Sequence, residues 1–478
     1  MHFNKKALFT VLAGFFVFAL QAQDIFSPLS TKGVGQLRSQ SFIHNLSMGG
    51  LGTAFTHWDS SSYSLKNPAT SSYLKYTAVD FGVKTGLNEV ISGTTGQSGV
   101  YDDFGLNYLS FAMVLDKSKA WTASFGIAPY SAFGYSTIKS YYADSLKIEE
   151  HIFSGGLSDF YLNTGFRLYT NKNKVRELKE LQYELKRKKI DSVIHIPHLK
   201  TLSGGIKGNF IFGSKNYEHN IHFTNENDLA SVQTVNNYLI RGFTYTAGLH
   251  YKISDLKFQT KRVKNDSNVV VKDHFVDFEL GAYFGSSASN SARLSRFATS
   301  FFIQGTSITV PDTVLPMQHS NGSFKLPNNM GLGFMFTKKD KWKLGMDIDY
   351  TQWSQFTYSG LTSTLNDELN ISLGGAIIPG SSNSEGFLKR TEYRMGLNYR
   401  QSFLNQNDKQ VVGYSATFGL GMPFNINYNN RSIRSGVNLG FELGSLGNTT
   451  TNGLQERFYN IYLGVTIDEF WFQRFREK

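Results

Sequence analysis

Two His-x-x-His motifs come closest, among the residues of this chain, to the spacing of a metal site. They are His195/His198 and His219/His222. A zinc-protease site needs a Glu directly after the first His, on a helix. Neither motif has that Glu, and both lie in predicted turns or loops. We interpret the four residues as surface histidines.

Other motifs of catalysis are missing from the sequence. It has no Gly-x-Ser-x-Gly nucleophile elbow and no Gly-x-x-x-x-Gly-Lys-[Ser/Thr] phosphate loop. Without Cys it can have no thiol nucleophile, disulfide or Cys-ligated metal. We predict that the protein is not an enzyme and uses no cofactor or metal.

Charged residues recur at alternate positions between apolar ones. Such residues could form acid–base pairs of a catalytic site. In a membrane barrel the simpler interpretation is a hydrogen-bonded polar lumen. The set comprises Asp80, Lys84, Arg167, Lys207, Asp277, Glu279, Lys343, Asp347, Asp349, Arg394, Arg400 and Glu442.

The composition indicates the class of protein that must position these residues. Hydrophobic residues make up only 40% of the 478 residues, yet 15% are aromatic, with 45 Gly against 9 Pro. This balance excludes a helical membrane protein and a disordered chain, and it suits an outer-membrane β-barrel. The net charge of +11 is concentrated in residues 171–200, so we predict no nucleic-acid partner.

The start of the chain is typical of a secretory signal peptide over residues 1–22. Lys5 and Lys6 precede an apolar run from Ala7 to Leu20, which is too short to span a bilayer as a helix. Residues 23–73 follow, rich in Gly, Ser and Thr and without a clear strand. The predicted location is the cell outer membrane, with the lipid bilayer as one partner.

From residue 74 to 468 the sequence alternates with a period of two, as in Trp342–Tyr350, and aromatic residues mark the segment ends. We predict an all-β fold, a 14-stranded antiparallel transmembrane barrel, with a tail over 469–478. The predicted strands are 75–86, 104–116, 119–130, 158–170, 201–213, 237–253, 275–286, 324–337, 341–355, 367–378, 390–402, 410–422, 431–444 and 454–467.

The links between these strands differ in length on the two sides of the predicted barrel. Short turns at 116–119 and 338–341 are expected on the periplasmic side, and longer polar links on the outer side, at 131–157, 214–236, 287–323 and 356–366. Two long charged links, 171–200 and 254–274, break this rule. In the first, Val175–Ile190 has helical spacing and the link carries nine Lys/Arg against four Asp/Glu, a net +5. It is either a solvated helix or a docking element, for a periplasmic or outer-membrane protein partner or for anionic lipid headgroups.

Several motifs resemble the long-chain fatty-acid channel family of outer-membrane proteins (FadL/TodX type, also called outer-membrane protein transport proteins). They are Met48–Phe55, then Asn67-Pro68-Ala69, and the later stretch Leu326–Trp353. The segment Gly419–Phe472 is similar to the C-terminal portion of Bacteroidetes members. The resemblance implies a fourteen-stranded barrel with an N-terminal hatch in the lumen, in which Asn67, Pro68 and Ala69 connect hatch to barrel.

The family also implies passive diffusion of hydrophobic molecules and a lateral exit at a kink in the third strand. Gly126, Pro129 and Gly134 supply such a kink from the residues themselves, because Pro cannot donate to a neighbouring strand. The alternative is that Pro129 ends the strand at the rim.

Two functions follow as hypotheses. The first is a channel for a hydrophobic small molecule such as a long-chain fatty acid. Its hatch residues line the passage or simply pack in the lumen. A luminal cation such as Arg167 or Lys207 is expected near a carboxylate. The second is a barrel without transport that docks on or plugs a secretion machine, as an accessory component of type IX secretion. The hatch residues are Phe42, Ile43, Met48, Leu51 and Phe55.

Overall fold

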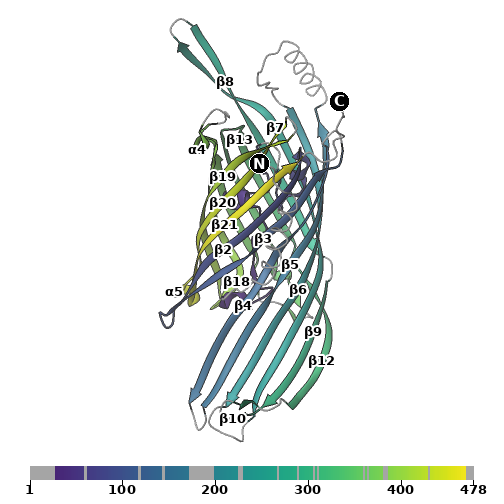
Figure 1. The fold of residues 1–478 in the computed structure, drawn as a ribbon, viewed down its shortest axis with the longest axis vertical. Helices are drawn as coiled ribbons and strands as arrows, with labels where there is room; N and C mark the ends of the chain where they lie inside the picture. The colour runs from purple at the N-terminus through teal and green to yellow at the C-terminus, as the bar shows by residue number, and fades with distance from the viewer. Residues whose placement is uncertain are drawn as a thin grey trace.

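The structure is a computed structural model in which most of the chain is described (Figure 1). The described residues are 27–58, 62–116, 120–142, 146–171, 199–223, 230–265, 268–287, 290–304, 307–308, 312–358, 361–362, 365–380, 386–428 and 431–469. The predicted signal peptide, the predicted helix within 171–200 and all but the first residue of the tail lie outside them. No helix in the described part is long and apolar enough to cross a membrane.

Fourteen strands form a closed antiparallel ring. In order around it they are β2 (Thr77–Ser92), β3 (Ser98–Val114), β4 (Trp121–Tyr142), β5 (Leu146–Thr170), β6 (Leu199–Phe223), β7 (Ser231–Asn265), β8 (Asn268–Ser287), β13 (Asn329–Lys338), β14 (Trp342–Thr351), β17 (Glu368–Ile377), β18 (Glu392–Gln406), β19 (Lys409–Tyr428), β20 (Arg431–Asn448) and β21 (Leu454–Glu469). The ring closes where β2 pairs with β21, from Thr77↔Glu469 to Ser92↔Leu454. The predicted 14-stranded barrel is confirmed.

Alternating burial along the strands follows the sequence pattern. On β14, Leu344 and Ile348 are 52% and 42% exposed, whereas Lys343 and Asp347 are 3% and 1% exposed. Apolar side chains therefore face outward, toward lipid, and charged ones face the lumen, as expected of a membrane barrel. Closing the ring pairs the backbone groups that a bilayer could not satisfy.

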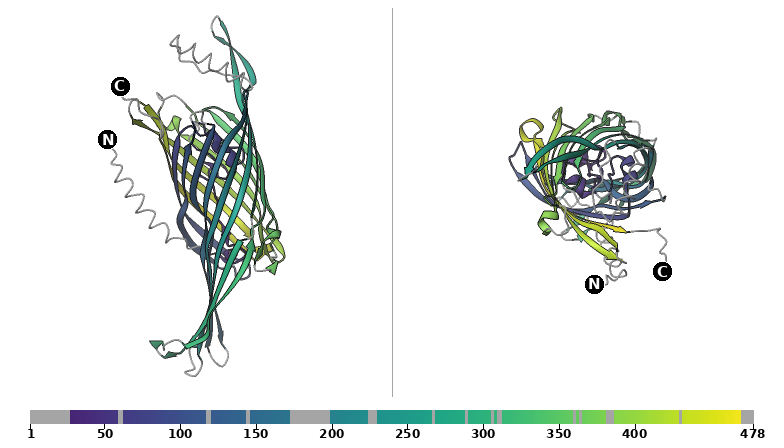
Figure 2. Two further views of the ribbon diagram at one scale, coloured as in Figure 1. Left: turned by 90° about the vertical axis from the view of Figure 1, so that its right-hand side faces the viewer. Right: turned by 90° about the horizontal axis from the view of Figure 1, so that it is seen from above.

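The longer outer links differ from simple loops. In 131–157 and 214–236 the strands β4 to β7 run on as paired hairpins well past the rim of their neighbours (Figures 1 and 2). The link 287–323 adds β9 (Asn290–Phe301) and most of β12 (Asp312–Lys325), which continue the same wall beside β7. We call this wall the outer extension. It was hard to predict because polar residues occupy both faces of these strands and hide the period of two.

Smaller elements complete the outer side and the opposite end. Two short pairs, β10 (Ile303–Gln304) with β11 (Ser307–Ile308) and β15 (Thr357–Tyr358) with β16 (Leu361–Thr362), lie in the outer links. The link 254–274 is a continuation of the β7–β8 hairpin at the opposite end. The remaining elements are η3 (Trp353–Gln355), α4 (Phe387–Arg390) and α5 (Thr449–Asn452).

The described part of the segment before β2 lies inside the ring, as the view along the barrel shows (Figure 2). It contains η1 (Pro28–Thr31), β1 (Gln36–Leu37), α2 (Ile43–Leu46) and η2 (Pro68–Tyr73). We call its described residues, 27–58 and 62–73, the hatch. Hatch residues pack in three apolar clusters. Leu29 and Val34 belong to the outer cluster, Phe42 and Ile43 to the middle one, and Met48 to the inner one.

Candidate luminal gate

Carboxylates of the barrel wall hold the backbone and polar side chains of the hatch. Asp347 accepts hydrogen bonds from the N–H groups of Gly52 and Thr53, at 2.7 and 2.9 Å. Glu279 accepts from the Thr56 hydroxyl at 2.8 and 2.7 Å. These acids, which the sequence placed in the lumen, anchor the hatch: Asp347 satisfies two of its backbone N–H groups and Glu279 satisfies a buried hydroxyl.

Two cations connect the hatch to the wall as well. Lys66 of the hatch places its Nζ 2.7 Å from Asp349 and 3.6 Å from Asp347. Burial acts to lower the pKa of the Lys66 ammonium, but Asp349 and Asp347 outweigh it and hold the pKa above its usual value. Lys207 of β6 donates to the carbonyl of Leu65 at 2.7 Å. Both ammonium groups are thus engaged in holding the hatch.

Glycines of the wall admit the hatch backbone where a side chain would collide with it. A Cβ on Gly281 of β8 would lie 1.9 Å from the carbonyl oxygen of Thr53. Gly35 in the hatch has φ +93°, and its Cβ would lie 2.6 Å from the Ala132 carbonyl oxygen of β4. The hatch therefore packs backbone against backbone on at least two strands.

The predicted hatch residues form the packed interior of the gate. Each is at most 1% exposed: Phe42, Ile43, Met48, Leu51 and Phe55. Phe42 and Phe55 lie on either side of the buried imidazole of His44, with ring centroids 5.5 and 5.2 Å from it. Burial, with the charges of His57 and Arg394, lowers the pKa of His44 well below its ordinary value.

The wall is interrupted between β3 and β4. Their pairing runs from Val114↔Thr122 only to Leu109↔Ile127, although β3 stays paired with β2 up to Ser98. At Pro129 the register of β4 with β5 shifts by one residue, so that Tyr130 has no partner on β5. Among the described residues, the outer half of β3 therefore lacks a neighbour on this side.

The hatch fills this interruption. Gln36 and Leu37 of β1 pair antiparallel with Ala132 and Ser131 of β4. Further out, Gly134 of β4 bonds through its carbonyl to the N–H of Ser27, at 2.8 Å. The predicted kink residues Gly126, Pro129 and Gly134 thus all lie where β4 leaves β3 and meets the hatch.

Arg38 connects the two edges of the interruption. Its N–H donates to the Tyr130 carbonyl of β4 at 3.0 Å, and its guanidinium bonds to Asp103 of β3 at 2.5 and 2.7 Å. Lys84 of β2 lies 2.9 Å from the same carboxylate. No sequence motif marked Arg38 or Asp103, because the two residues are 65 positions apart in the chain.

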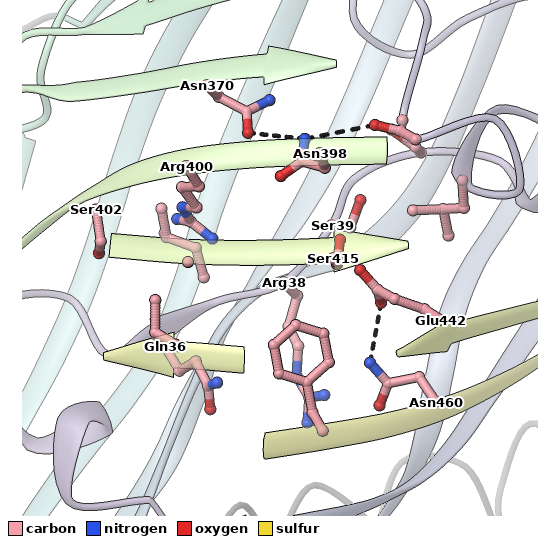
Figure 3. Close-up of a pocket in the computed structure, with 18 of the residues that line it drawn as sticks. Gln36, Arg38, Ser39, Asn370, Asn398, Arg400, Ser402, Ser415, Glu442 and Asn460 are labelled. Carbon is pink, nitrogen blue, oxygen red and sulfur yellow. Dashed lines mark hydrogen bonds between the residues drawn. The ribbon is translucent and has the colours of Figure 1, made fainter. Parts of the chain in front are cut away.

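A chamber of about 350 Å³ with a mixed polar and apolar lining lies between hatch residues such as Arg38 and the strands of the wall (Figure 3). Amides and charges line it: Asn398 donates to Asn370 at 2.9 Å, and Asn460 donates to Glu442 at 2.9 Å. A second space of about 250 Å³ shares Arg38 and Lys66 with it. Apolar side chains such as Leu37 lie among the polar residues that line both spaces.

The remaining predicted residues occupy separate places. Asn67 caps η2, since its side chain accepts from the Ala69 N–H at 3.1 Å after Pro68 begins the helix. Arg167 lies opposite Ser203 near one end of β5, and Lys207 lies opposite Asn163. The structure therefore does not bring the two predicted luminal cations together.

Comparisons with known proteins give one family. The model of the family described as BamG matches residues 4–174 and 193–477. No curated protein matches the chain.

Several solved structures are similar. The CymD monoaromatic hydrocarbon channel has 12% identity and a TM-score of 0.48, over 91% of this chain and 98% of that one. The toluene transporter TodX of Pseudomonas putida has 14% identity and a TM-score of 0.45, over 91% and 99%. The toluene transporter TbuX of Ralstonia pickettii has 10% identity and a TM-score of 0.47, over 89% and 98%.

Proposed function

The chain belongs to the BamG family, and we propose that it is a non-enzymatic outer-membrane barrel that admits hydrophobic small molecules sideways, between β3 and β4. The hatch acts as the gate, and long-chain fatty acids are one class of cargo. The observation that carries the proposal is that the β3–β4 pairing stops at Leu109↔Ile127 and hatch strand β1 takes its place on β4.

A lateral route suits an apolar cargo for a physical reason. Each Å² of apolar surface moved from lipid into water costs about 25 cal/mol. A path through the wall lets the cargo stay in contact with the bilayer, whereas the chamber would also place amides and charges such as Asn370 and Arg400 against it. A carboxylate at the head of the cargo would compete with Asp103 for Arg38 and Lys84 at the inner side of the opening.

Locking the gate tests this function. The chain has no Cys, so Leu37→Cys with Ser131→Cys creates a single designed pair. Antiparallel partners have Cα atoms about 4.5–5.5 Å apart, within the range of a disulfide. Under oxidising conditions this variant should lose uptake of a long-chain fatty acid into outer-membrane vesicles, and reduction should restore it.

A matched control locks a part of the wall that is already paired. Leu109→Cys with Ile127→Cys cross-links β3 to β4 below the interruption and should leave uptake unchanged. Equal uptake by the oxidised and reduced Leu37/Ser131 variant, at equal amounts of folded barrel, would refute the lateral route.

A second function is favoured by the outer extension. Strands β4 to β7, with β9 and β12, run past the rim on one side of the barrel only (Figure 1). A spanning strand needs about 9–11 residues, but β5 and β6 have 25 each. Such a one-sided wall suits docking on a larger outer-membrane assembly, including the secretion machine expected from the sequence, with 171–200 as a further contact.

Purification from native outer membranes separates the two functions. A partner protein in fixed stoichiometry, lost when the β9–β12 hairpin is removed, would support docking. Recovery of the barrel alone, together with gate-dependent uptake, would support transport.

A further inference from the structure

Two histidines of the outer extension face each other across neighbouring strands. His151 of β5 and His219 of β6 are register partners. Their rings are stacked, with centroids 4.4 Å apart and an angle of 4° between the planes. The sequence motif had paired His219 with His222 instead, but residues three apart on a strand point to opposite faces.

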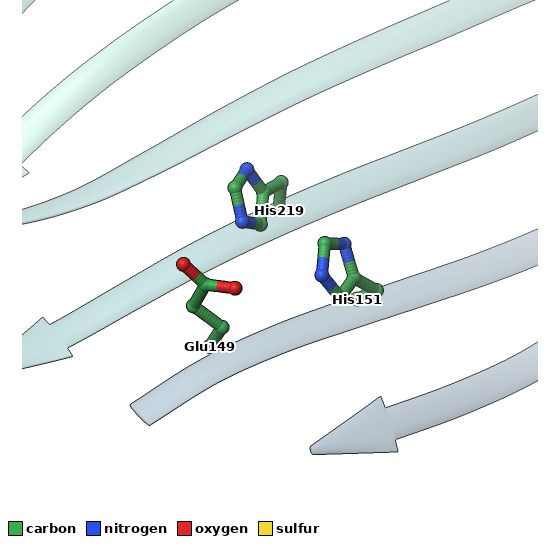
Figure 4. Close-up of side chains that lie close together, drawn as sticks. All are labelled: Glu149, His151 and His219. Atoms are coloured by element: carbon green, nitrogen blue, oxygen red, sulfur yellow. The ribbon is translucent and has the colours of Figure 1, made fainter. Parts of the chain in front are cut away.

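A carboxylate completes the group. Glu149 lies two residues before His151 on β5 and therefore on the same face (Figure 4). One donor atom from each of Glu149, His151 and His219 lies within 4.8 Å of the other two. Tetrahedral zinc with bonds of 2.0–2.2 Å separates its ligands by roughly 3.4 Å. Small rotations of the three side chains would therefore close the site.

The surroundings of the imidazoles prepare them for a metal. His151 Nδ1 forms a hydrogen bond of 2.9 Å with the Tyr217 hydroxyl, which fixes the ring and leaves Nε2 for a ligand bond. His219 Nε2 is shielded from solvent and has no hydrogen-bond partner among the described residues. Lys147, which pairs with Glu149, is the group that a cation would displace.

We propose that Glu149, His151 and His219 bind a divalent transition metal, of which Zn²⁺ is the best match to two imidazoles and one carboxylate. Three protein ligands leave a fourth position open for water or for a group from another molecule. The three residues share the strand parity of Leu157 and Lys215, which face the lumen and the hatch. The metal would thus lie on the inner face of the extension and join β5 to β6.

Calorimetry on the full-length protein in detergent tests the site. After removal of metals with a chelator, ZnCl₂ is titrated into the wild type and into His151→Ala, His219→Ala and Glu149→Gln. We expect saturable binding whose affinity falls at least tenfold in each variant. Tyr217→Phe, which removes only the hydrogen bond to His151, should weaken binding by about 10–100-fold.

The control is His222→Ala, on the same strand but outside the group, which should bind zinc as the wild type does. Heat-modifiable migration verifies that each variant is folded. Two results would overturn the proposal: no saturable binding to the wild type, or the same affinity in the folded His151→Ala/His219→Ala double variant as in the wild type.

Discussion

Arg38 of the hatch holds Asp103 of β3 through two hydrogen bonds, of 2.5 and 2.7 Å. Arg38 therefore closes the opening between β3 and β4 from both edges. Its side chain binds Asp103 on β3, and its backbone N–H binds the Tyr130 carbonyl on β4. Because the Asp103 side chain is only 1% exposed, water cannot easily replace it as a partner of Arg38 and Lys84 when it is removed.

Asp103→Asn should therefore loosen the gate and destabilise the protein. Breaking a buried ion pair leaves an uncompensated charge and costs about 3 kcal/mol. We expect a lower midpoint in guanidinium titrations followed by tryptophan fluorescence, and faster labelling of a Cys at position 37. Glu89→Gln breaks the exposed 3.5 Å pair with Arg457 and should cost less than about 1 kcal/mol. Equal effects of the two changes would contradict the role of Asp103 in closing the opening.

Gly281→Val should displace the hatch from β8, since its Cβ would overlap the Thr53 carbonyl. We expect the hatch to become cleavable by protease while the barrel keeps its heat-modifiable migration. In Gly436→Val, on β20, the nearest atom lies 3.7 Å from the new Cβ, so the hatch should stay protected. If protease left the hatch intact in both variants, the contact between Gly281 and Thr53 would tolerate a side chain, and the prediction would be wrong.

Protonation of His44 should unlock the hatch at low pH. Its pKa in the folded protein lies well below the ordinary 6.5, so the unfolded chain binds a proton that the folded chain does not. The contribution of His44 to stability is complete above pH 6.5 and falls as the pH drops below that value. His44→Phe, which keeps a ring between Phe42 and Phe55, should flatten this part of the curve of unfolding midpoint against pH. A curve of unchanged slope below pH 6.5 would assign the loss to other groups.

The sidedness of the barrel can be read by labelling single cysteines in whole cells. Ser320 lies exposed on β12 of the outer extension, and Lys339 lies exposed in the turn between β13 and β14 at the opposite end. Ser320→Cys should react with an impermeant thiol reagent, and Lys339→Cys should react only after lysis. The reverse pattern would invert the topology.

The barrel was predictable because lipid on one side and a polar lumen on the other force alternation, as on β14, where Leu344 faces out and Lys343 faces in. The outer extension runs past the rim of the neighbouring strands, where we expect no lipid on either face, and its strands carry no such pattern. The gate was predictable only in part. Pro129 marks where β4 changes partner, since proline cannot donate, but nothing local indicates that Asp103 would find Arg38. The same holds for His151 and His219, which the β5–β6 register brings together.

The enclosed hatch also sets an order of assembly. The chain enters the ring at β2, directly after the hatch, and the ring is completed by β21, the last strand, which pairs with β2 along its whole length. Once that seam has formed, a continuous ring of strands surrounds a segment whose backbone lies against Gly281 on one strand and pairs with Ser131 on another. We therefore expect the hatch to take its place while the sheet is still open, so that closing the seam between the first and last strands captures it.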